Sequence, residues 1–539
     1  MMNNHFRCMA LRGLSLFTAA AWLTACAASQ AAAPAASEST ADEAVTFMAP
    51  YLNVEAFIDK VHSIYPEVNI EIVPYSGDNT TSCIQNMIEA HDLPDICTVT
   101  VYNPMTDDMS DQLIDLAGYD FTDNYIESRL QEVTDNGAIY LLPSVYNCYG
   151  ITYNKTLLQQ NGWAVPTSFA ELEQLAEKAE AAGVALCLPQ SQYPGYGFQY
   201  MCNIADADFL GTLDGKRWQK DYLSGKANVS GTPGMMQAMA YIQKWRDIGM
   251  LNGDGDPTSD EVTRQRMING DALFLLGSTN GIVEADGTRD KFGLMPYLSE
   301  DGSQNVFVLS VNRYFGLNKR LEQNPQKLED ALKVMRVLST VEGTTALYPE
   351  TKVKSSLMPF KNAKANGTYY TDIADALNFG STAPFIYSGW ENTIVTTGNK
   401  MLDFMRGDAT IDEVIAQLDG DQDKVVNNTP DLITTAAEDI PQEDCARLVG
   451  RCFAEATGSD LALVSLGTWI SGNPTEQNHY GVSGKLYAKG LTDYDLSVIL
   501  PTGWNRTIQT VTLTGSQIND LLTEGYDATA TENAIPMCW

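Results

Sequence analysis

The sequence predicts an α/β fold built on a parallel sheet. Strand and helix candidates alternate over residues 45–100, in the order strand, helix, strand, helix, strand. The 539 residues are enough for several compact units, so we expect two or more domains. The composition, 44% hydrophobic and 19% charged, is that of a globular protein and not of a disordered chain.

The expected strands of the first sheet are short apolar segments at 45–49, 68–73 and 95–100. Helices separate them, and in the first helix Phe57 and Val61 recur at helical spacing. Because consecutive parallel strands are joined by crossover helices, this order favours a parallel sheet. Ligands of such sheets bind beyond the carboxyl ends of the strands, so the segments that follow these strands are candidate binding loops.

A second passage, 136–155, holds two strand candidates, the first ending in Leu-Pro and the second in Tyr-Asn-Lys. Ser168 and Glu171 have the spacing of a capping box, which predicts the start of a helix. Gly183 is expected to end that helix before a strand at 184–188.

The charge balance argues against nucleic-acid binding. The chain carries 34 basic and 68 acidic residues, a formal net charge of −34. Affinity for a phosphate backbone depends on Lys and Arg displacing counterions, so no nucleic-acid partner is expected. Self-repulsion at this charge suits a monomer held outside a cell.

The N-terminus has the features of a processing signal. Residues 1–26 contain a positive start and an apolar core, and they end in Leu-Thr-Ala-Cys, which resembles a bacterial lipobox with Cys26 as the lipidated residue. Residues 27–43 read as a flexible tether. The alternative is an ordinary secretory signal with an incidental cysteine. No other apolar run approaches the roughly 20 residues of a membrane span. We therefore expect a protein on the extracellular face of the bacterial cell membrane, held by its lipid anchor alone.

Motifs for catalysis are missing from the sequence. None of the ten cysteines forms a C-x-x-C pair, and the four histidines are scattered. There is no Gly-x-Ser-x-Gly elbow and no Walker A loop. We expect no catalytic residues, no metal site, no cofactor and buried thiols, and hence a protein that is not an enzyme.

The ordered motifs resemble the extracellular solute-binding proteins of carbohydrate ABC importers, the class that contains the maltose-binding protein. The resemblance covers about residues 44–425. The motifs are the passage 136–188, Pro-Asp-Ile at 94–96, Asn-Gly-Asp-Ala at 269–272, the helix 328–343, and Trp390 with the helix pattern at 407–414.

This resemblance implies a two-lobed periplasmic-binding-protein-like fold with a hinge. The implied first lobe comprises 44–147 and 295–340, and the second comprises 148–294 and 341–425. The solute would lie between the lobes, and ABC importer permease subunits would be the protein partners.

The resemblance and the chemistry of sugars, which need hydrogen-bonding groups and aromatic platforms, together suggest a set of binding residues. They are Tyr51, Asn53, Tyr102, Asn103, Tyr146, Asn147, Tyr193, Tyr196, Tyr200, Ser278, Thr279, Asn280 and Trp390. Tyr146 and Trp390 have packing as their alternative role, and Trp245 is expected in the core. The family often places Trp where this chain has Ser278-Thr279, which leaves one platform, and thus the sugar class, open.

Residues 426–440 are expected to form a linker, and 441–539 resemble part of the C-terminal domain of 5′-nucleotidases, a small α/β (α+β) unit. A helix at 443–458 and a strand at 461–465 open this unit. The Arg of the family's substrate turn is replaced by Ile470, so a degenerate accessory domain is expected. Two alternatives to sugar capture remain: binding of a nucleoside or other solute, and a nucleotidase-related activity together with a partner.

Overall fold

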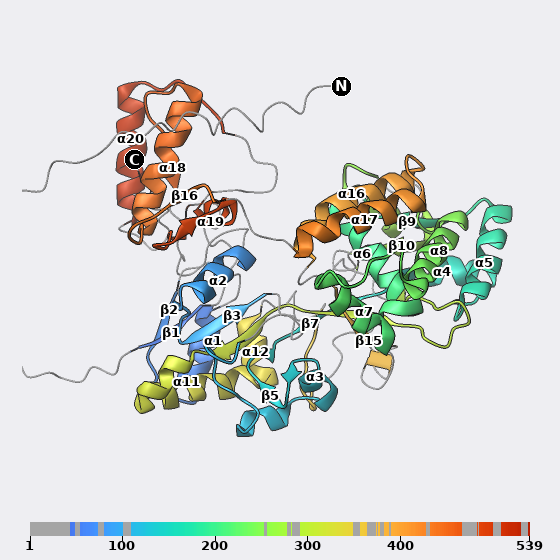
Figure 1. The fold of residues 1–539 in the computed structure, drawn as a ribbon, viewed down its shortest axis with the longest axis horizontal. Helices are drawn as coiled ribbons and strands as arrows, with labels where there is room; N and C mark the ends of the chain where they lie inside the picture. Colours follow the sequence, from blue (N-terminus) through green and yellow to red (C-terminus); the bar gives the residue numbers. More distant parts are fainter. Residues whose placement is uncertain are drawn as a thin grey trace, which may run out of the picture.

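The computed structural model describes residues 44–48, 54–73, 80–100, 109–252, 256–277, 282, 291–348, 356–363, 373, 376–377, 382–386, 390–426, 432–465, 482, 484–499, 508–529 and 537–538. These form two α/β lobes joined by a small sheet, with a C-terminal unit on the first lobe (Figure 1).

The first lobe is built on a five-stranded sheet in the order β2-β1-β3-β13-β6. As the sequence predicts, β1 pairs in parallel with both β2 and β3. The antiparallel strand β13, from far along the chain, lies between β3 and β6. The elements are β1 (Val45–Phe47), α1 (Val54–His62), β2 (Ile70–Ile72), α2 (Thr80–Glu89), β3 (Ile96–Val99), η1 (Asp120–Asn124), α3 (Glu127–Gln131), β4 (Thr134–Asp135), β5 (Ala138–Ile139), β6 (Leu142–Pro143), β13 (Tyr314–Leu317), η4 (Lys319–Gln323), α11 (Pro325–Leu338) and α12 (Val341–Leu347).

The second lobe has a four-stranded sheet in the order β11-β8-β10-β9. Its helix α5 begins as predicted, because the Ser168 side chain accepts a hydrogen bond from the Glu171 N–H. Gly183 ends α5 with φ 69°, a left-handed conformation that glycine adopts without strain. The elements are β8 (Ile151–Asn154), α4 (Lys155–Asn161), α5 (Phe169–Ala182), β9 (Ala185–Pro189), α6 (Pro194–Ala205), η2 (Asp206–Leu210), α7 (Leu213–Leu223), α8 (Pro233–Asp247), α9 (Asp260–Asn269), β10 (Ala272–Leu276), β11 (Phe292–Met295), α16 (Glu391–Arg406) and α17 (Ile411–Val426).

Two passages of chain run side by side in opposite directions from one lobe to the other. The first passage is β6-β7-β8, and the second is β11-β12-β13. Their strands pair at every stage: β6 with β13, β7 with β12, and β8 with β11. The middle pair belongs to a separate sheet, β14-β7-β12-β15, which we call the crossing sheet. Its strands are β14 (Ser356–Leu357), β7 (Tyr146–Tyr149), β12 (Phe307–Val311) and β15 (Thr382–Pro384).

The junction between β7 and β8 leaves no room for a side chain. A Cβ added at Gly150 would lie 2.6 Å from the Met295 carbonyl oxygen and 3.0 Å from Leu294 Cγ. The backbone of the two passages therefore approaches closely at the point where the chain enters the second lobe.

Two segments pack in a different lobe from the one that the sequence predicts. Tyr297 and Val306, expected in the first lobe, pack in the core of the second. Leu347 and Tyr348, expected in the second lobe, pack in the core of the first. The reason is topological: the second passage changes lobe only through β12, and α12 packs against α1.

A buried carboxylate organises the first lobe. Asp95, which is 1% exposed, accepts hydrogen bonds from the Thr46 N–H (2.9 Å) and hydroxyl (2.8 Å) and pairs with Lys327 Nζ at 2.8 Å. Burial acts to raise the pKa of Asp95, but the bonds from Lys327 and Thr46 outweigh it, and the pKa lies below its ordinary value. Asp95 thus ties β1 and β3 to α11.

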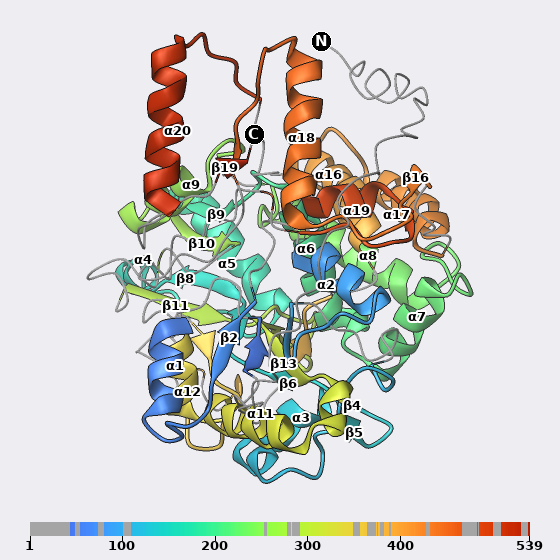
Figure 2. The ribbon, with the colours of Figure 1, turned by 90° about the vertical axis from the view of Figure 1, so that its left-hand side faces the viewer.

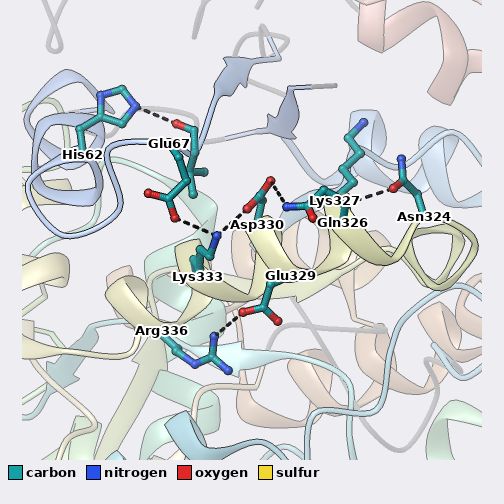
Figure 3. Close-up of polar contacts among 10 residues, drawn as sticks. His62, Glu67, Asn324, Gln326, Lys327, Glu329, Asp330, Lys333 and Arg336 are labelled. Carbon is teal, nitrogen blue, oxygen red and sulfur yellow. Dashed lines mark hydrogen bonds and ion pairs between the residues drawn. The ribbon is translucent and has the colours of Figure 1, made fainter. Parts of the chain in front are cut away.

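A further ion pair joins Lys333 of α11 to Glu67, which lies between α1 and β2. Lys333 lies 2.9 Å from both Glu67 and Asp330, and Arg336 reaches Glu329 on the same helix (Figure 3). Arg336 and Glu329 are solvent-accessible, so their pair contributes little stability. Lys333 and Asp330 are mostly buried, and Lys333 links α11 to Glu67.

An aromatic cluster fills the second lobe. Trp390 stacks on Tyr222 with ring centroids 4.6 Å apart and an interplanar angle of 5°. Trp218 and Phe198 pack on the same indole at 6.2 and 6.0 Å. Trp245 is fully buried, which confirms the prediction that it belongs to the core.

The C-terminal unit packs on α2 of the first lobe, and its helices α18 and α20 project beyond that lobe (Figure 2). The predicted helix over 443–458 is confirmed as α18, which Gly458 ends with φ 66°. The predicted strand over 461–465 is reduced to β17. The elements are β16 (Thr434–Thr435), α18 (Gln442–Thr457), β17 (Val464–Ser465), β18 (Gly490–Leu491), α19 (Asp493–Ile499), α20 (Gly515–Thr529) and β19 (Met537–Cys538).

Within the described part of the chain, six cysteines are buried free thiols, as expected: Cys83, Cys97, Cys148, Cys187, Cys202 and Cys445. Cys452 is also a free thiol but is exposed, which contradicts the expectation for this residue.

Gly150→Ala is expected to lower the melting temperature, because the new Cβ meets backbone that cannot move without shifting both passages. A cost of about 1–3 kcal/mol is typical of such overpacking. Gly118→Ala is the matched control, since a Cβ there meets nothing within 4 Å. Equal melting temperatures for the two variants would contradict the close approach.

Asp95→Asn should destabilise the protein by about 3 kcal/mol at neutral pH, because it leaves Lys327 without its buried carboxylate. The folded-state pKa of Asp95 is lowered, so its contribution is complete above the unfolded pKa and is lost as pH falls through the folded value. Urea titrations of wild type and variant should therefore converge in acid. Asp214→Asn, at an exposed ion pair with Arg217, is the control and should have little effect.

Trp390→Ala is expected to destabilise the second lobe by about 3–5 kcal/mol, since it removes a buried aromatic side chain from a stacked cluster. Val395→Ala, at a 57% exposed position on the same helix, should be nearly silent. Thermal unfolding measures both. A stable Trp390→Ala protein would show that the cluster is not needed for packing.

Candidate functional site

Many of the expected binding residues lie outside the described residues. They are Tyr51, Asn53, Tyr102, Asn103, Ser278, Thr279 and Asn280, together with the expected lipidation residue Cys26.

Tyr146 and Asn147 are neighbours on β7, so their side chains point to opposite faces of the crossing sheet. Tyr146 is 1% exposed, its hydroxyl donates to Glu132 Oε2 at 2.9 Å, and the Arg129 guanidinium lies over its ring. Tyr146 therefore packs inside the protein, the alternative that the sequence left open for it. Asn147 is half-buried opposite Ser310 of β12 and Ser356 of β14.

Trp390 and Tyr200, two further candidates for ligand contact, are also interior residues. Trp390 is 3% exposed, and one face of its indole is covered by Tyr222. Tyr200 is fully buried, and its hydroxyl approaches the carbonyl oxygens of Gln190 (2.8 Å) and Leu276 (3.0 Å). Tyr200 thus holds together the carboxyl ends of β9 and β10.

The structure brings Tyr193 and Tyr196 together at these strand ends. Tyr193 is 37% exposed, and its ring lies 6.2 Å from that of Tyr196. The Tyr196 hydroxyl donates to Asp260 Oδ2 at 2.8 Å. The Asp260 N–H in turn donates to the side-chain oxygen of Gln192 at 3.0 Å. We call Gln192, Tyr193, Tyr196 and Asp260 the strand-end cluster.

Asp260 is the unusual member of the strand-end cluster. Asp260 is only 7% exposed. Its Oδ1 atom has no hydrogen-bond partner among the residues that the structure describes. Burial raises the pKa of Asp260, although the bond from Tyr196 opposes the shift. Burial and the neighbouring carboxylate also raise the pKa of Tyr196, so its hydroxyl remains a donor.

Local sequence explains how these side chains are placed. Pro194 starts α6 directly after Tyr193, and Ser259 caps α9 by accepting from the Val262 N–H. Gly277 follows β10 with φ 133°, and a Cβ there would lie 2.1 Å from Gln190 Oε1. A glycine at this position lets the two strand ends approach each other.

Sequence reasoning missed Asp260. Its only local signal is an acidic residue in the first turn of a helix, which normally indicates a favourable interaction with the helix dipole. Its contact with Tyr196 joins residues that are 64 positions apart, so nothing in either segment alone indicates it.

The strand-end cluster combines an exposed aromatic ring, a hydroxyl group and a buried carboxylate oxygen that has no hydrogen-bond partner among the described residues. These groups can accept hydrogen bonds and cover an apolar face, which suits binding. Within the described ranges, no group of three or more His, Cys, Asp or Glu side chains could hold a metal ion. No helix among the same residues is long and apolar enough to cross a bilayer.

Solved structures show the same fold over most of this chain. A family 1 extracellular solute-binding protein from Bifidobacterium longum subsp. infantis matches with a TM-score of 0.57 at 15% identity, over 70% of this chain and 98% of that one. The binding protein MsmE from Bacillus subtilis, in an open conformation, gives 0.58 at 13% identity over 73% and 100%. A chitin oligosaccharide binding protein gives 0.54 at 15% over 71% and 99%. At these identities the likeness concerns the fold.

Sequence comparison gives a curated relative and a family. The maltodextrin-binding protein MdxE of Bacillus subtilis (strain 168) is 25% identical over 185 residues, which is 32% of this chain and 40% of that protein. The chain thus aligns with less than half the length of this relative. The model of the bacterial extracellular solute-binding protein family matches residues 54–351, more than half of the chain. Together with the two-lobed fold, this match shows that the protein belongs to the bacterial extracellular solute-binding proteins.

Proposed function

We propose that this protein captures a sugar or oligosaccharide outside the cell and delivers it to an ABC importer. The observation that carries the proposal is the strand-end cluster. There a buried carboxylate, one oxygen of which has no partner among the residues that the structure describes, lies near an exposed tyrosine. Sugars present hydroxyl donors and apolar C–H faces, which match these two groups. The relatives named for chitin oligosaccharide and maltodextrin support the same class of ligand.

The binding step in this proposal is closure of the two lobes on the solute. The paired passages through the crossing sheet provide a short connection about which the lobes can rotate. Closure follows binding only if the solute contacts the closed state more favourably than the open one. Contacts from the strand-end cluster on one lobe and from the loops after β1 and β3 on the other would supply that difference.

The proposal includes attachment to the membrane through a lipid on Cys26, with 27–43 as the tether. Membership of an extracellular family agrees with this location. Permease subunits of the importer are the proposed protein partners. We also propose that residues 441–539 are related to the C-terminal domain of 5′-nucleotidases. In this proposal the unit is an accessory domain without its own catalytic site.

Calorimetric titration of the mature chain with a panel of sugars and nucleosides tests the proposal. A sugar should bind, and Asp260→Asn should weaken it at least tenfold, about 1.4 kcal/mol, because a carboxylate acceptor is lost. Acidification should weaken sugar binding because it protonates Asp260. Since the pKa of Asp260 is raised, this loss should begin at a higher pH than it would for an aspartate with an ordinary pKa. Tyr193→Ala should also weaken binding.

Asp271→Asn, an exposed position just beyond the other end of α9, is the matched control and should bind like wild type. Melting temperatures establish that the variants are folded. Saturable binding of a nucleoside and of no sugar would overturn the ligand class. Sugar binding that is unchanged by Asp260→Asn would remove the strand-end cluster from the site.

A further inference from the structure

A cavity lies between the first lobe and the C-terminal unit, and none of its lining residues belongs to the strand-end cluster. Its volume is ≈ 380 Å³, within the range of about 300–1,000 Å³ that is common for small-molecule sites. The first lobe contributes residues from β1, α2 and the segment before β3, and the C-terminal unit contributes Pro441, Gln442, Gly484, Lys485, Tyr487 and Val498.

The two sides are held together by a charged seam. Lys489 Nζ lies 2.6 Å from Glu89 on α2 and 3.1 Å from the buried Asp495 of α19. Asp92 accepts from the Tyr487 hydroxyl at 3.1 Å and pairs with Lys485 at 2.5 Å. Val498 is buried in the apolar core of the first lobe. The cavity is thus bordered by an interface with specific ion pairs and hydrogen bonds.

The walls of this cavity are mainly apolar. Val73, Met87, Pro94 and Val498 line it together with the ring of Tyr487. Water in such a space gains few hydrogen bonds from its walls, so an apolar body is the better occupant.

The polar groups of the walls are mostly donors. Lys485 and Arg320 line the cavity with one acidic side chain, Asp92, which already pairs with Lys485. Arg320 is 3.6 Å from Asp95, whose closer cationic partner is Lys327 at 2.8 Å. Asn86 also lines the cavity; it is 4% exposed, and its Nδ2 has no hydrogen-bond partner within the described part of the chain. A local excess of positive charge is notable in a chain of net charge −34.

We propose that this cavity binds a small amphipathic anion, a carboxylate with an apolar body. The apolar body lies against Val73, Met87 and Val498, and the carboxylate accepts hydrogen bonds from Arg320 and Asn86. Because each side of the interface supplies part of the wall, the ligand stabilises the docking of the C-terminal unit on α2. The site is separate from the sugar site, so its occupancy does not require sugar binding.

Octanoate is the test ligand, titrated calorimetrically into the mature full chain. We expect saturable binding at one site, whereas octylamine, with the same apolar chain and a cationic head, does not bind. Arg320→Gln should weaken octanoate at least tenfold, and Met87→Trp should abolish its binding by filling the cavity. Gln85→Trp, at an exposed position on the same helix, is the matched control and should bind octanoate like wild type.

Melting temperatures and sugar titration establish that each variant remains folded, so loss of octanoate binding with retained sugar binding isolates the cavity. If the Met87→Trp variant does not fold, the octanoate affinity of Arg320→Gln alone tests the proposal. No heat from octanoate, equal binding of octylamine, or octanoate binding that survives Arg320→Gln would each overturn the proposal. These outcomes are independent of whether a sugar binds between the lobes.

Discussion

The antiparallel pairing of two chain passages is the constraint on which this architecture depends. Each passage contributes one strand to the first lobe, one to the crossing sheet and one to the second lobe. The register of each pair limits the others in the first passage and between β12 and β13, where at most two residues separate consecutive strands. Gly150 lies where this constraint is tightest, since the two backbones approach too closely for a side chain. Two independent cores can then form on either side of a connection that is itself ordered by hydrogen bonds.

Within each lobe, polar groups at strand ends have different tasks that follow from their partners. Asp95 has several donors, including a lysine, and its pKa is lowered, so it serves as an internal anchor. Asp260 has one tyrosine donor for one oxygen and, in the part of the chain that the structure describes, none for the other, and its pKa is raised. A buried carboxylate oxygen without a donor lowers the stability of the folded protein unless a ligand binds it. That difference is the physical reason for assigning structure to Asp95 and ligand binding to Asp260.

The C-terminal unit extends the first lobe instead of forming a separate body on a tether. Its ion pairs reach α2, and Val498 completes the apolar core of the lobe. A ligand bound at this interface would therefore contact both the first lobe and the C-terminal unit.

Local sequence determined the elements and tertiary structure determined the site. Apolar periodicity and the caps at Ser168 and Gly183 were sufficient to predict the helices α1, α2 and α5 and the parallel β1-β2-β3 unit, because these depend on near neighbours in the chain. The burial of Trp245 also followed from helical spacing. The sequence could not determine which aromatic residues face solvent. Tyr222 covers the ring of Trp390, the Tyr200 hydroxyl donates to the Leu276 carbonyl, and the ring of Tyr146 lies under Arg129. The pairing of Tyr196 with Asp260 and the lobe changes through β12 likewise depend on long-range packing, which local periodicity does not encode.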